Sequence, residues 1–568
     1  MDSFVIRVGG EAGWGIATAA NLIAHIFIKL GYHVFSSKEY ASQIKGGHNY
    51  HTLRISSKPL GADVDKVDML LALDSVTVEK HTSYVVDGGM ILYNDSIEIK
   101  DTKSTVTYVP LPITTIQQTL NEKNIANTVF VGAAIKSLNI EYDVLKSVMA
   151  DIFNHKLQLL DILANAAHTG YDSMEKGVGI GLSAGEKSSL EFYNGNGAIT
   201  KGALDAGITF HAQYPMTPVS AILHDLAKES INNKDLTVIQ PEDEIAAINM
   251  ALGASYAGSR AMTATSGGGF SLMVESVGLA SMAELPLVII EGQRPGPATG
   301  LPTKTEQGDL SFVLSAGQGD FPHVVIAPGN VQECYTETKR AFYLAEKYQL
   351  PVIVLVDTLL AESFSTIKLS NTLNIDFSQR FNIIDNANQY QMKNGLFMRY
   401  SEDNFLRTLP GTKNGIYTCA GDEHTNVGSI TEDPTIRNGM MRHRMGKLKK
   451  IEEELPVPEL YGSINADMTL VCWGSTTSAV MEVVNRLGTE GKSVNMVHMK
   501  YMCPFHTSSV HDILSKSNKI LLIENNYTGQ LGKLIMEKTG IHVNDTILKY
   551  DGQPFTVDEL YNLIIQKW

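Results

Sequence analysis

Short apolar runs alternate with helical patterns over most of this 568-residue chain, and this alternation restricts the fold more than any other feature of the sequence. Consecutive parallel strands need a crossover connection, which is usually a helix, so the alternation predicts an α/β fold with mainly parallel sheets. A chain of this length also exceeds the size of one hydrophobic core, which predicts several domains.

The alternation occurs in three stretches, which predict three βα domains at residues 1–185, 190–368 and 461–568. A polar run at 183–189 is typical of a linker. Residues 369–460 are rich in Asn, Asp, Gly and charged residues and have weak periodicity, so we expect an irregular connecting segment there. The predicted strands are 3–8, 69–72, 208–213, 236–240, 261–265, 287–291, 352–356, 468–473, 493–498 and 520–523.

Charge and hydropathy exclude two classes of function. The formal net charge of −15 argues against a protein that binds nucleic acid or an anionic membrane surface. No apolar run reaches the roughly 18 residues of a membrane span. The segment Met1–Arg7 lacks the pattern of a signal peptide, so we expect a cytoplasmic protein.

The four cysteines are isolated from one another in the sequence. They are Cys334, Cys419, Cys472 and Cys503, and none forms a Cys-x-x-Cys pair. We therefore expect neither a zinc or iron–sulfur site nor a disulfide framework within this chain.

Two glycine-containing segments of the first stretch invite a ligand interpretation. The turn Gly9–Gly15 could present backbone N–H groups to an anion at a helix start, but it lacks the spacing and the acidic residue of a nicotinamide site. The segment 42–51 contains Lys45, His48 and His51. Without a third metal ligand nearby, we interpret this segment as a turn that places Lys45 and His48 at an interface or ligand.

Polar residues follow four predicted strands of the second stretch at the point where each strand ends. Because the carboxyl ends of parallel strands share one edge of a sheet, these residues should gather at a ligand site. Each has a simpler explanation alone, since acidic residues suit a helix start and prolines shape turns. The four segments are 214–218, 241–244, 266–269 and 292–297.

These motifs resemble those of the 2-oxoacid:ferredoxin oxidoreductases. Met216 replaces the isoleucine of the family's Tyr-Pro-Ile-Thr-Pro motif, and Gly268 stands where a proline is expected. The motifs are Gly195–Ala203, Tyr214–Pro218, Glu242–Ala247, Thr263–Phe270 and Arg294–Thr303.

The resemblance covers nearly the whole chain as a fusion of gamma and alpha subunits. Lys45–Asn49 resembles a segment of the gamma module, which is Rossmann-like, and Glu524–Leu531 resembles a segment of the transketolase-C-like module. Between them lies the segment that resembles the domain binding the pyrimidine ring of thiamine diphosphate.

The resemblance implies oxidative decarboxylation of a 2-oxoacid with coenzyme A to an acyl-CoA, CO₂ and reduced ferredoxin. In such enzymes a glutamate hydrogen-bonds the pyrimidine ring of thiamine diphosphate, which then acts as its own base. That glutamate is assigned to Glu244, with Glu242 as the runner-up. Tyr214 and Pro215 are expected at the cofactor, and Thr217 with Arg294 at the substrate 1-carboxylate.

A weaker correspondence assigns Lys45 and His48 to closure over the substrate or coenzyme A. The fused architecture favours 2-oxoglutarate as the substrate, while pyruvate and branched-chain or aryl 2-oxoacids remain alternatives. A non-catalytic nucleotide-binding or regulatory relative is a second class of function, against which the intact Thr217, Glu244 and Arg294 argue.

The chain also lacks parts that the reaction requires. It has no Gly-Asp-Gly followed by a distant Asn to hold Mg²⁺ and the diphosphate, which also disfavours a transketolase-type enzyme, and it has no cysteine ligands for a cluster. The resemblance places both the Mg²⁺–diphosphate site and a 4Fe-4S cluster in a beta subunit. The expected assembly is (alpha–beta)₂, with ferredoxin as the electron acceptor.

Overall fold

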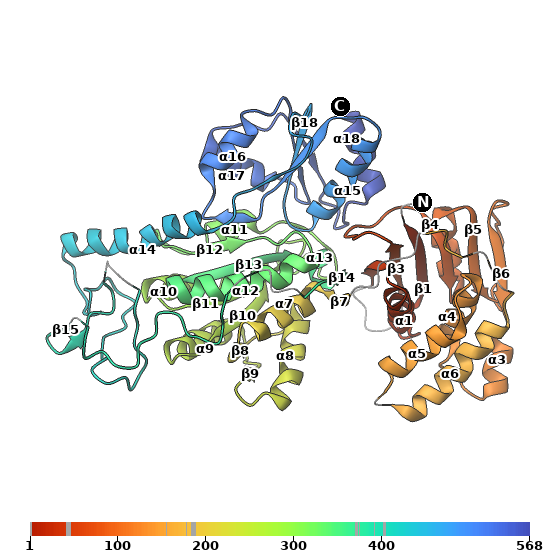
Figure 1. Cartoon of the computed structure of the whole chain (residues 1–568), viewed down its shortest axis with the longest axis horizontal. Helices are drawn as coiled ribbons and strands as arrows, with labels where there is room; N and C mark the ends of the chain where they lie inside the picture. The colour runs from red at the N-terminus through yellow and green to blue at the C-terminus, as the bar shows by residue number, and fades with distance from the viewer. Residues whose placement is uncertain are drawn as a thin grey trace. The chain divides into compact units, whose positions relative to one another are not determined.

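The chain folds into several mainly parallel α/β sheets, which confirms the predicted fold class (Figure 1). It divides into two compact units, the first comprising residues 1–193, 362–369 and 556–559 and the second the remainder. The computed structural model describes residues 3–40, 47–154, 156–175, 177, 179–182, 189–369, 373, 375–390, 392–401 and 405–568.

The sheet of the first unit is mixed, with the strand order β6-β5-β4-β1-β3-β2-β14-β7. Pairing is parallel from β6 to β1 and antiparallel from β1 through β3 and β2 to β14. The strands are β1 (Phe4–Glu11), β2 (His33–Glu39), β3 (His48–Ser56), β4 (Val67–Ala72), β5 (Val85–Asn94), β6 (Thr107–Leu111), β7 (Glu191–Asn194) and β14 (Phe364–Ile367).

The antiparallel part of this sheet differs from the parallel arrangement that the sequence predicts. Strand β1 continues through Gly9 and Gly10, which were assigned to the turn, and residues 48–51 begin β3 and do not form a turn. The reason is that β3 begins with polar residues and buries only its second half, so it lacks the apolar run used to predict the other strands.

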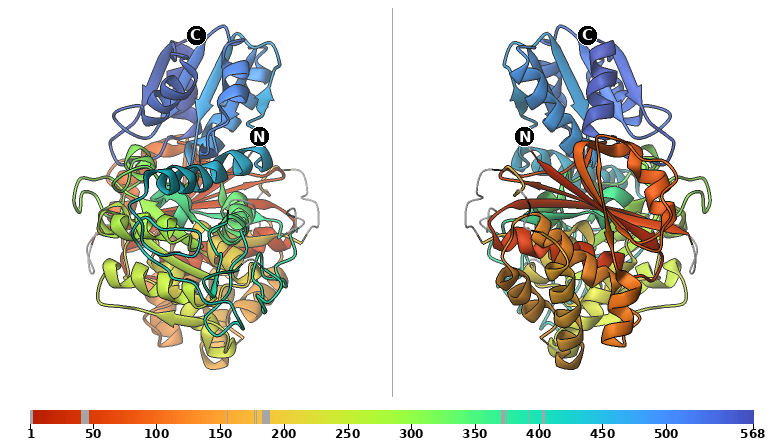
Figure 2. Two further views of the ribbon diagram at one scale, coloured as in Figure 1. Left: turned by 90° about the vertical axis from the view of Figure 1, so that its left-hand side faces the viewer. Right: turned by 90° about the vertical axis from the view of Figure 1, so that its right-hand side faces the viewer.

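A layer of helices covers one face of this sheet (Figure 2). Helix α1 (Ile16–Lys29) buries Ile23 and Phe27 completely against it. Helices α4 (Ala126–Ser137) and α6 (Leu157–Asp172) approach each other closely at Gly132 and Gly170. A Cβ atom on either glycine would overlap the backbone of the other helix, so only glycine permits this approach. The first unit thus has a core of its own.

The second unit contains a seven-stranded sheet with the order β20-β12-β13-β11-β10-β8-β9, in which only β20 is antiparallel to its neighbour. The predicted strands 261–265, 287–291 and 352–356 are confirmed to within two residues at each end. The strands are β8 (Phe210–Ala212), β9 (Thr237–Ile239), β10 (Ala261–Ser266), β11 (Leu287–Gln293), β12 (Val324–Ile326), β13 (Pro351–Asp357) and β20 (Tyr501–Cys503).

Two groups of helices pack on this sheet. The first group consists of α7 (Gly195–Asp205), α8 (Ser220–Asn232) and α12 (Val331–Tyr348). The second consists of α9 (Glu244–Tyr256) and α10 (Gly267–Met282), whose buried residues share a core cluster with alternate residues of β11 and β13. Because β12, β13, β11, β10, β8 and β9 are parallel, their carboxyl ends lie at the same edge of the sheet.

A smaller five-stranded sheet, with the order β17-β19-β18-β21-β22, belongs to the same unit. Val471 of this sheet and Trp473, which follows β18, are completely buried in the same core cluster as Ile289 of β11. The strands are β17 (Leu460–Gly462), β18 (Met468–Cys472), β19 (Val494–His498), β21 (Ile520–Glu524) and β22 (Asp545–Leu548). The helices of this part of the chain are α15 (Thr476–Thr489), α16 (Thr507–Leu514), α17 (Gln530–Thr539) and α18 (Val557–Gln566).

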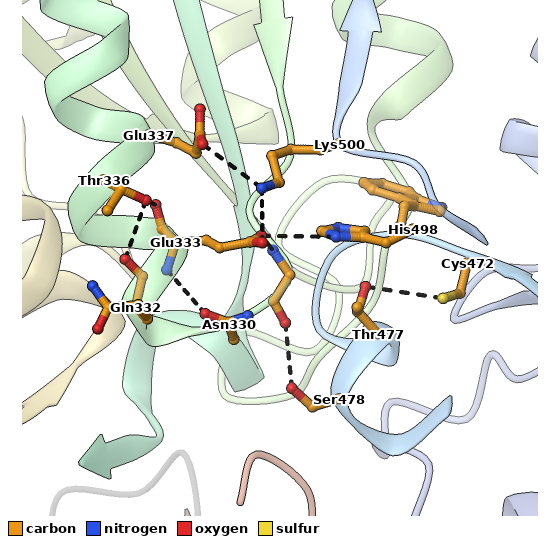
Figure 3. A network of polar contacts seen from close by, with 12 residues as sticks. Asn330, Gln332, Glu333, Thr336, Glu337, Cys472, Thr477, Ser478, His498 and Lys500 are labelled. Carbon is orange, nitrogen blue, oxygen red and sulfur yellow. Dashed lines mark hydrogen bonds and ion pairs between the residues drawn. The ribbon is translucent and has the colours of Figure 1, made fainter. Parts of the chain in front are cut away.

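A polar cluster around Glu333 joins the start of α12 to the strands of the smaller sheet (Figure 3). The Glu333 carboxylate accepts a hydrogen bond from Gly329 N at 2.7 Å and pairs with Lys500 Nζ at 2.7 Å. His498 Nδ1 lies 3.8 Å from the same carboxylate. Burial raises the pKa of Glu333. His498, Lys500 and the Gly329 N–H lower it by more than burial raises it, so the net shift of the pKa is downward.

We expect Glu333→Gln to lower the free energy of unfolding by about 1–2 kcal/mol near neutral pH, because glutamine can keep the Gly329 hydrogen bond but loses the charge. A depressed carboxyl pKa contributes stability above the ordinary pKa, and this contribution is lost as the pH falls through the native-state value. Denaturant unfolding at several pH values should therefore show the two proteins converging below roughly pH 4. A constant difference down to acidic pH would contradict this account.

The connecting segment ends in a long helix, α14 (Pro434–Glu454), where the sequence analysis predicted irregular structure. The helix begins at Asp433, whose side chain accepts hydrogen bonds from two backbone N–H groups of the first turn. It was missed because it buries charged residues in place of an apolar stripe. Lys447 is 1% exposed and lies 2.5 Å from the Glu284 carboxylate, and Arg444 pairs with Glu423 at 2.8 Å.

Within the ranges described above, every helix is too short or too polar to span a lipid bilayer.

Candidate functional site

Three consecutive acidic residues stand before and at the start of α9, and the structure gives each a different environment. Glu242 is exposed. Asp243 is the N-cap, and its carboxylate accepts a hydrogen bond from Ala246 N at 2.8 Å. Glu244 is the first helical residue and is 6% exposed. Capping thus accounts for Asp243 and leaves Glu244 as the buried acid.

The Glu244 carboxylate lies against Gly269 in the first turn of α10. A Cβ atom on Gly269 would stand 2.7 Å from Glu244 Oε1 and would also overlap Thr265 Oγ1, so only glycine fits there. No other described residue hydrogen-bonds the Glu244 carboxylate. A buried carboxylate without a donor fits a ligand that brings an N–H group, as an aminopyrimidine ring does.

The loop after β8 carries Tyr214, Pro215 and Thr217, which are all partly buried. Two side chains hold its carbonyl groups: Asn196 Nδ2 donates to Pro218 O at 2.8 Å, and Gln213 Nε2 donates to Val219 O at 3.0 Å.

Gln213 is in turn oriented by His211, whose Nε2 lies 2.9 Å from Gln213 Oε1. Burial lowers the pKa of His211 to about 4, although the Gln213 hydrogen bond opposes this shift. The ring is therefore neutral near pH 7, and as the Nε2–H tautomer it donates to Gln213. Hydrogen bonds between uncharged groups therefore hold the loop in place.

Arg294 follows β11 and reaches the same loop. Its Nη1 donates a hydrogen bond to Thr217 O at 3.2 Å, and the side chain is half-buried. Gly292 allows this approach, because a Cβ atom there would stand 2.7 Å from Val219 Cγ1. The structure therefore brings Thr217 and Arg294 together, as the sequence predicted for residues at one sheet edge.

Glu244 lies at this same edge, one strand away from the Thr217 loop. Strands β10, β8 and β9 are neighbours and parallel, so the segments that follow them leave the sheet at the same side. Among the described residues no hydrogen bond joins Glu244 to Thr217 or Arg294. The edge thus offers a carboxylate and a guanidinium–hydroxyl pair as two separate binding elements.

The two residues predicted in the first unit have different outcomes. Lys45 lies outside the described residues. His48 begins β3, and its Nε2 lies 2.7 Å from His81 Nε2, while Arg7 Nη1 lies 3.2 Å from His81 Nδ1. Arginine only donates, so His81 Nδ1 must accept and the proton of His48 must be on Nδ1. Burial and the Arg7 charge lower the pKa of His81 to about 3.

Sequence reasoning did not find the residues that support the site. His211 and Gln213 look like ordinary strand residues in the sequence, and Asn196 belongs to the motif Gly195–Ala203 but received no role of its own. Asp309 is another, because its carboxylate lies against Gly267 at the start of α10 although the two are far apart in the chain. Only the position of Gln213 directly before the Tyr214 loop could have indicated its role.

Three family models together cover most of the chain. Residues 201–402 match "Pyruvate flavodoxin/ferredoxin oxidoreductase, thiamine diP-bdg", residues 5–173 match "Pyruvate ferredoxin/flavodoxin oxidoreductase", and residues 466–560 match "Pyruvate:ferredoxin oxidoreductase core domain II". The candidate site lies within the thiamine diphosphate-binding match.

Curated relatives align over almost the full length. The chain is 32% identical to the 2-oxoacid:ferredoxin oxidoreductase subunit alpha of a Sulfolobus species, with 98% of this chain and 96% of the relative covered. It is 27% identical to the 2-oxoglutarate oxidoreductase subunit KorA of Mycobacterium tuberculosis, with 99% and 91% covered.

A solved structure is similar over the whole chain. It is the 2-oxoglutarate:ferredoxin oxidoreductase of Magnetococcus marinus with 2-oxoglutarate, coenzyme A and succinyl-CoA bound, at 30% identity, a TM-score of 0.90 and 100% coverage of both chains. With a carboxylate and a guanidinium at the carboxyl edge of its thiamine diphosphate-binding domain, the chain belongs to the 2-oxoacid:ferredoxin oxidoreductases, as an alpha subunit of these multi-subunit enzymes.

Proposed function

We propose that this chain supplies the pyrimidine half of a thiamine diphosphate site and the grip on the substrate 1-carboxylate in a 2-oxoglutarate:ferredoxin oxidoreductase. The single observation that carries this proposal is the buried Glu244 carboxylate, which has no partner among the described residues and lies beside a glycine that leaves no room for a side chain.

The Glu244 carboxylate would accept a hydrogen bond from the pyrimidine ring nitrogen of bound thiamine diphosphate when that nitrogen is protonated. It stands at the N-terminus of α9, where the helix dipole and the free N–H groups of the first turn interact favourably with a carboxylate. When bound, thiamine diphosphate supplies a nucleophilic carbon and an electron sink for decarboxylation. Tyr214 and Pro215, held with their loop by Asn196 and Gln213, border the cofactor on the neighbouring strand end.

Arg294 and Thr217 bind the 1-carboxylate of the 2-oxoacid. A guanidinium can use one N–H for Thr217 O and present its remaining N–H groups in a fixed plane to a carboxylate, while the Thr217 hydroxyl adds a donor. Holding the carboxylate in place orients the C–C bond that must break.

We further propose 2-oxoglutarate as the substrate and assign Lys45 and His48 to closure over the substrate or coenzyme A. The first assignment is supported by the 2-oxoglutarate relatives and by the solved structure that holds 2-oxoglutarate and coenzyme A. The second is supported by the fixed Nδ1–H of His48, a donor suited to an anionic oxygen.

The remaining parts of the active site belong to a beta subunit in this proposal, which supplies the Mg²⁺–diphosphate site and the 4Fe-4S cluster in an (alpha–beta)₂ assembly. Helices α9 and α10 are mainly apolar and leave Ile245 at 49% and Leu272 at 51% exposed, together with Met250 and Leu279. Exposed apolar side chains on two neighbouring helices are typical of an interaction surface, so this face is the proposed docking surface.

The test is co-expression of the chain with its beta subunit, followed by reduction of ferredoxin or viologen with a panel of 2-oxoacids and coenzyme A. We expect the highest kcat/KM for 2-oxoglutarate and no turnover by the chain alone. A clearly higher kcat/KM for pyruvate or a branched-chain 2-oxoacid would refute the substrate. Turnover or an iron–sulfur absorption band in the chain alone would refute the division between subunits.

A further inference from the structure

A row of three hydrogen-bonded side chains in the first unit ends at His48, the residue proposed to close over the substrate or coenzyme A. Arg7 belongs to β1, His81 is the last residue of helix α2 (Ser75–His81), and His48 begins β3. Arg7 Nη1 lies 3.2 Å from His81 Nδ1, and His81 Nε2 lies 2.7 Å from His48 Nε2. Both ring nitrogens of His81 are therefore engaged, one by each neighbour.

The guanidinium at the start of this row is held in one orientation. Arg7 is 7% exposed, and its Nε donates a hydrogen bond to Thr52 Oγ1 at 3.1 Å. The rings of Tyr50 and Tyr84 also contact the guanidinium, with their centroids 5.0 and 5.2 Å from Arg7 Cζ. Since arginine does not lose its proton in proteins, it presents a permanent donor to His81.

This permanent donor decides where each proton of the row lies. Because Arg7 only donates, His81 Nδ1 accepts, and a neutral His81 carries its proton on Nε2. That N–H donates to His48 Nε2, which leaves the proton of a neutral His48 on Nδ1. Burial and the Arg7 charge lower the pKa of His81 to about 3, and burial lowers the pKa of His48, so both rings are neutral near pH 7.

The Nδ1–H group of His48 is left without an acceptor. The nitrogen is buried and has no hydrogen-bond partner among the residues that the structure describes. Gly9 gives the ring its place, because a Cβ atom there would stand 3.2 Å from His48 Cε1 and would overlap Thr77. A buried donor without an acceptor is costly, so this position suits a ligand that brings an acceptor oxygen.

We propose that Arg7 and His81 are positioning residues that fix the proton of His48 on Nδ1, so that His48 donates a hydrogen bond to an anionic oxygen of the bound 2-oxoacid or coenzyme A and does not accept a proton from it. A neutral imidazole can carry its proton on either nitrogen, and the other tautomer would turn an acceptor toward the anion. The shared chemistry is a carboxylate or phosphate oxygen. This inference rests on the proposed role of His48.

The location of the proton can be measured without activity, by nitrogen-15 NMR of the full chain labelled in its histidines. Protonated and unprotonated ring nitrogens have well-separated chemical shifts, and His48→Gln identifies the signals of His48 by their loss. We expect Nδ1 to be protonated and Nε2 unprotonated in the wild type. The two tautomers should mix in Arg7→Met, which has no donor, and Arg7→Lys should restore the single tautomer, because lysine also only donates. A wild-type His48 with its proton on Nε2, or an unchanged tautomer in Arg7→Met, would overturn the inference.

Kinetics of the assembled complex test the ligand and distinguish its two sources. His48→Leu should raise the KM of either coenzyme A or the 2-oxoacid roughly tenfold, as expected for the loss of a hydrogen bond to a charged group. The affected substrate is the one that His48 contacts, and the KM of the other is the internal control. Arg7→Met should raise the same KM roughly threefold or more, because the apparent affinity falls with the fraction of molecules in the competent tautomer. Arg7→Lys should return that KM toward the wild-type value.

Two kinetic results would count against the inference. An equal rise of both KM values in Arg7→Met, or no rise of the KM that His48→Leu raises, would remove Arg7 as a positioning residue. If the NMR signals behave as expected but His48→Leu changes neither KM, the proposed role of His48 at a ligand fails, while the fixed position of its proton stands.

Discussion

Replacing Glu244 by glutamine is expected to lower the turnover of the assembled enzyme by about 10²–10⁴-fold, the range typical of a lost general acid–base group. Glutamine keeps the size of the side chain, and the N-cap Asp243 that begins α9 is untouched. It cannot hold the pyrimidine proton, because its amide is not basic. Steady-state kcat with ferredoxin or viologen is the measurement, and thermal unfolding should show the fold unchanged.

The matched control for this prediction is Glu242→Gln, which removes the same charge two residues earlier at an exposed position. It should leave turnover close to the wild-type value. If the Glu242 variant loses turnover and the Glu244 variant does not, the roles of the two acids are reversed. If both variants keep normal turnover, neither residue holds the cofactor.

Replacing Arg294 by lysine should lower kcat/KM for the 2-oxoacid roughly ten- to hundredfold, the equivalent of about 1.5–3 kcal/mol for a hydrogen bond to a charged group. Lysine keeps the charge but has no planar fork. The present guanidinium already uses Nη1 for Thr217 O, so a single ammonium group would have to serve both the loop and the substrate.

This loss should be equal for every 2-oxoacid in the panel, since all of them share the 1-carboxylate. Arg442→Lys is a suitable control, because Arg442 is exposed on α14 and far along the chain from the site. A loss confined to 2-oxoglutarate would assign Arg294 to the distal carboxylate instead. No loss for any substrate would remove it from the site.

The central strands β10, β11 and β13 of the second unit could be predicted because they are fully buried, and β11 and β13 contain unbroken apolar runs. Strand β11, Leu287–Gln293, is buried at all seven positions, and its prediction was confirmed. Strand β3 and helix α14 could not be predicted in this way. The first begins with the polar residues His48–His51, and the second is held by buried ion pairs such as Lys447–Glu284, which hydrophobic periodicity does not report.

The candidate site shows a similar limit. The sequence predicted that Thr217 and Arg294 would share one edge, because parallel strands place their carboxyl ends together, and the structure joins them by a hydrogen bond. The resemblance assigned the cofactor glutamate to Glu244 and left Glu242 as the runner-up, because both suit a helix start. The choice depends on which residue caps the helix, and only the three-dimensional structure shows that Asp243 does so. The catalytic roles of these residues stay predictions.

Strand β14 gives the first unit a sequence that is not contiguous. Residues 364–367 pair with β2, so the sheet is completed by a segment that follows the whole first half of the second unit in the chain. A gene fragment that ends before residue 190 would therefore encode a protein with an open sheet edge at β2, where unpaired backbone groups invite aggregation. Soluble expression of this module would require the two missing strands, β14 and β7, to be grafted onto the fragment or supplied as peptides.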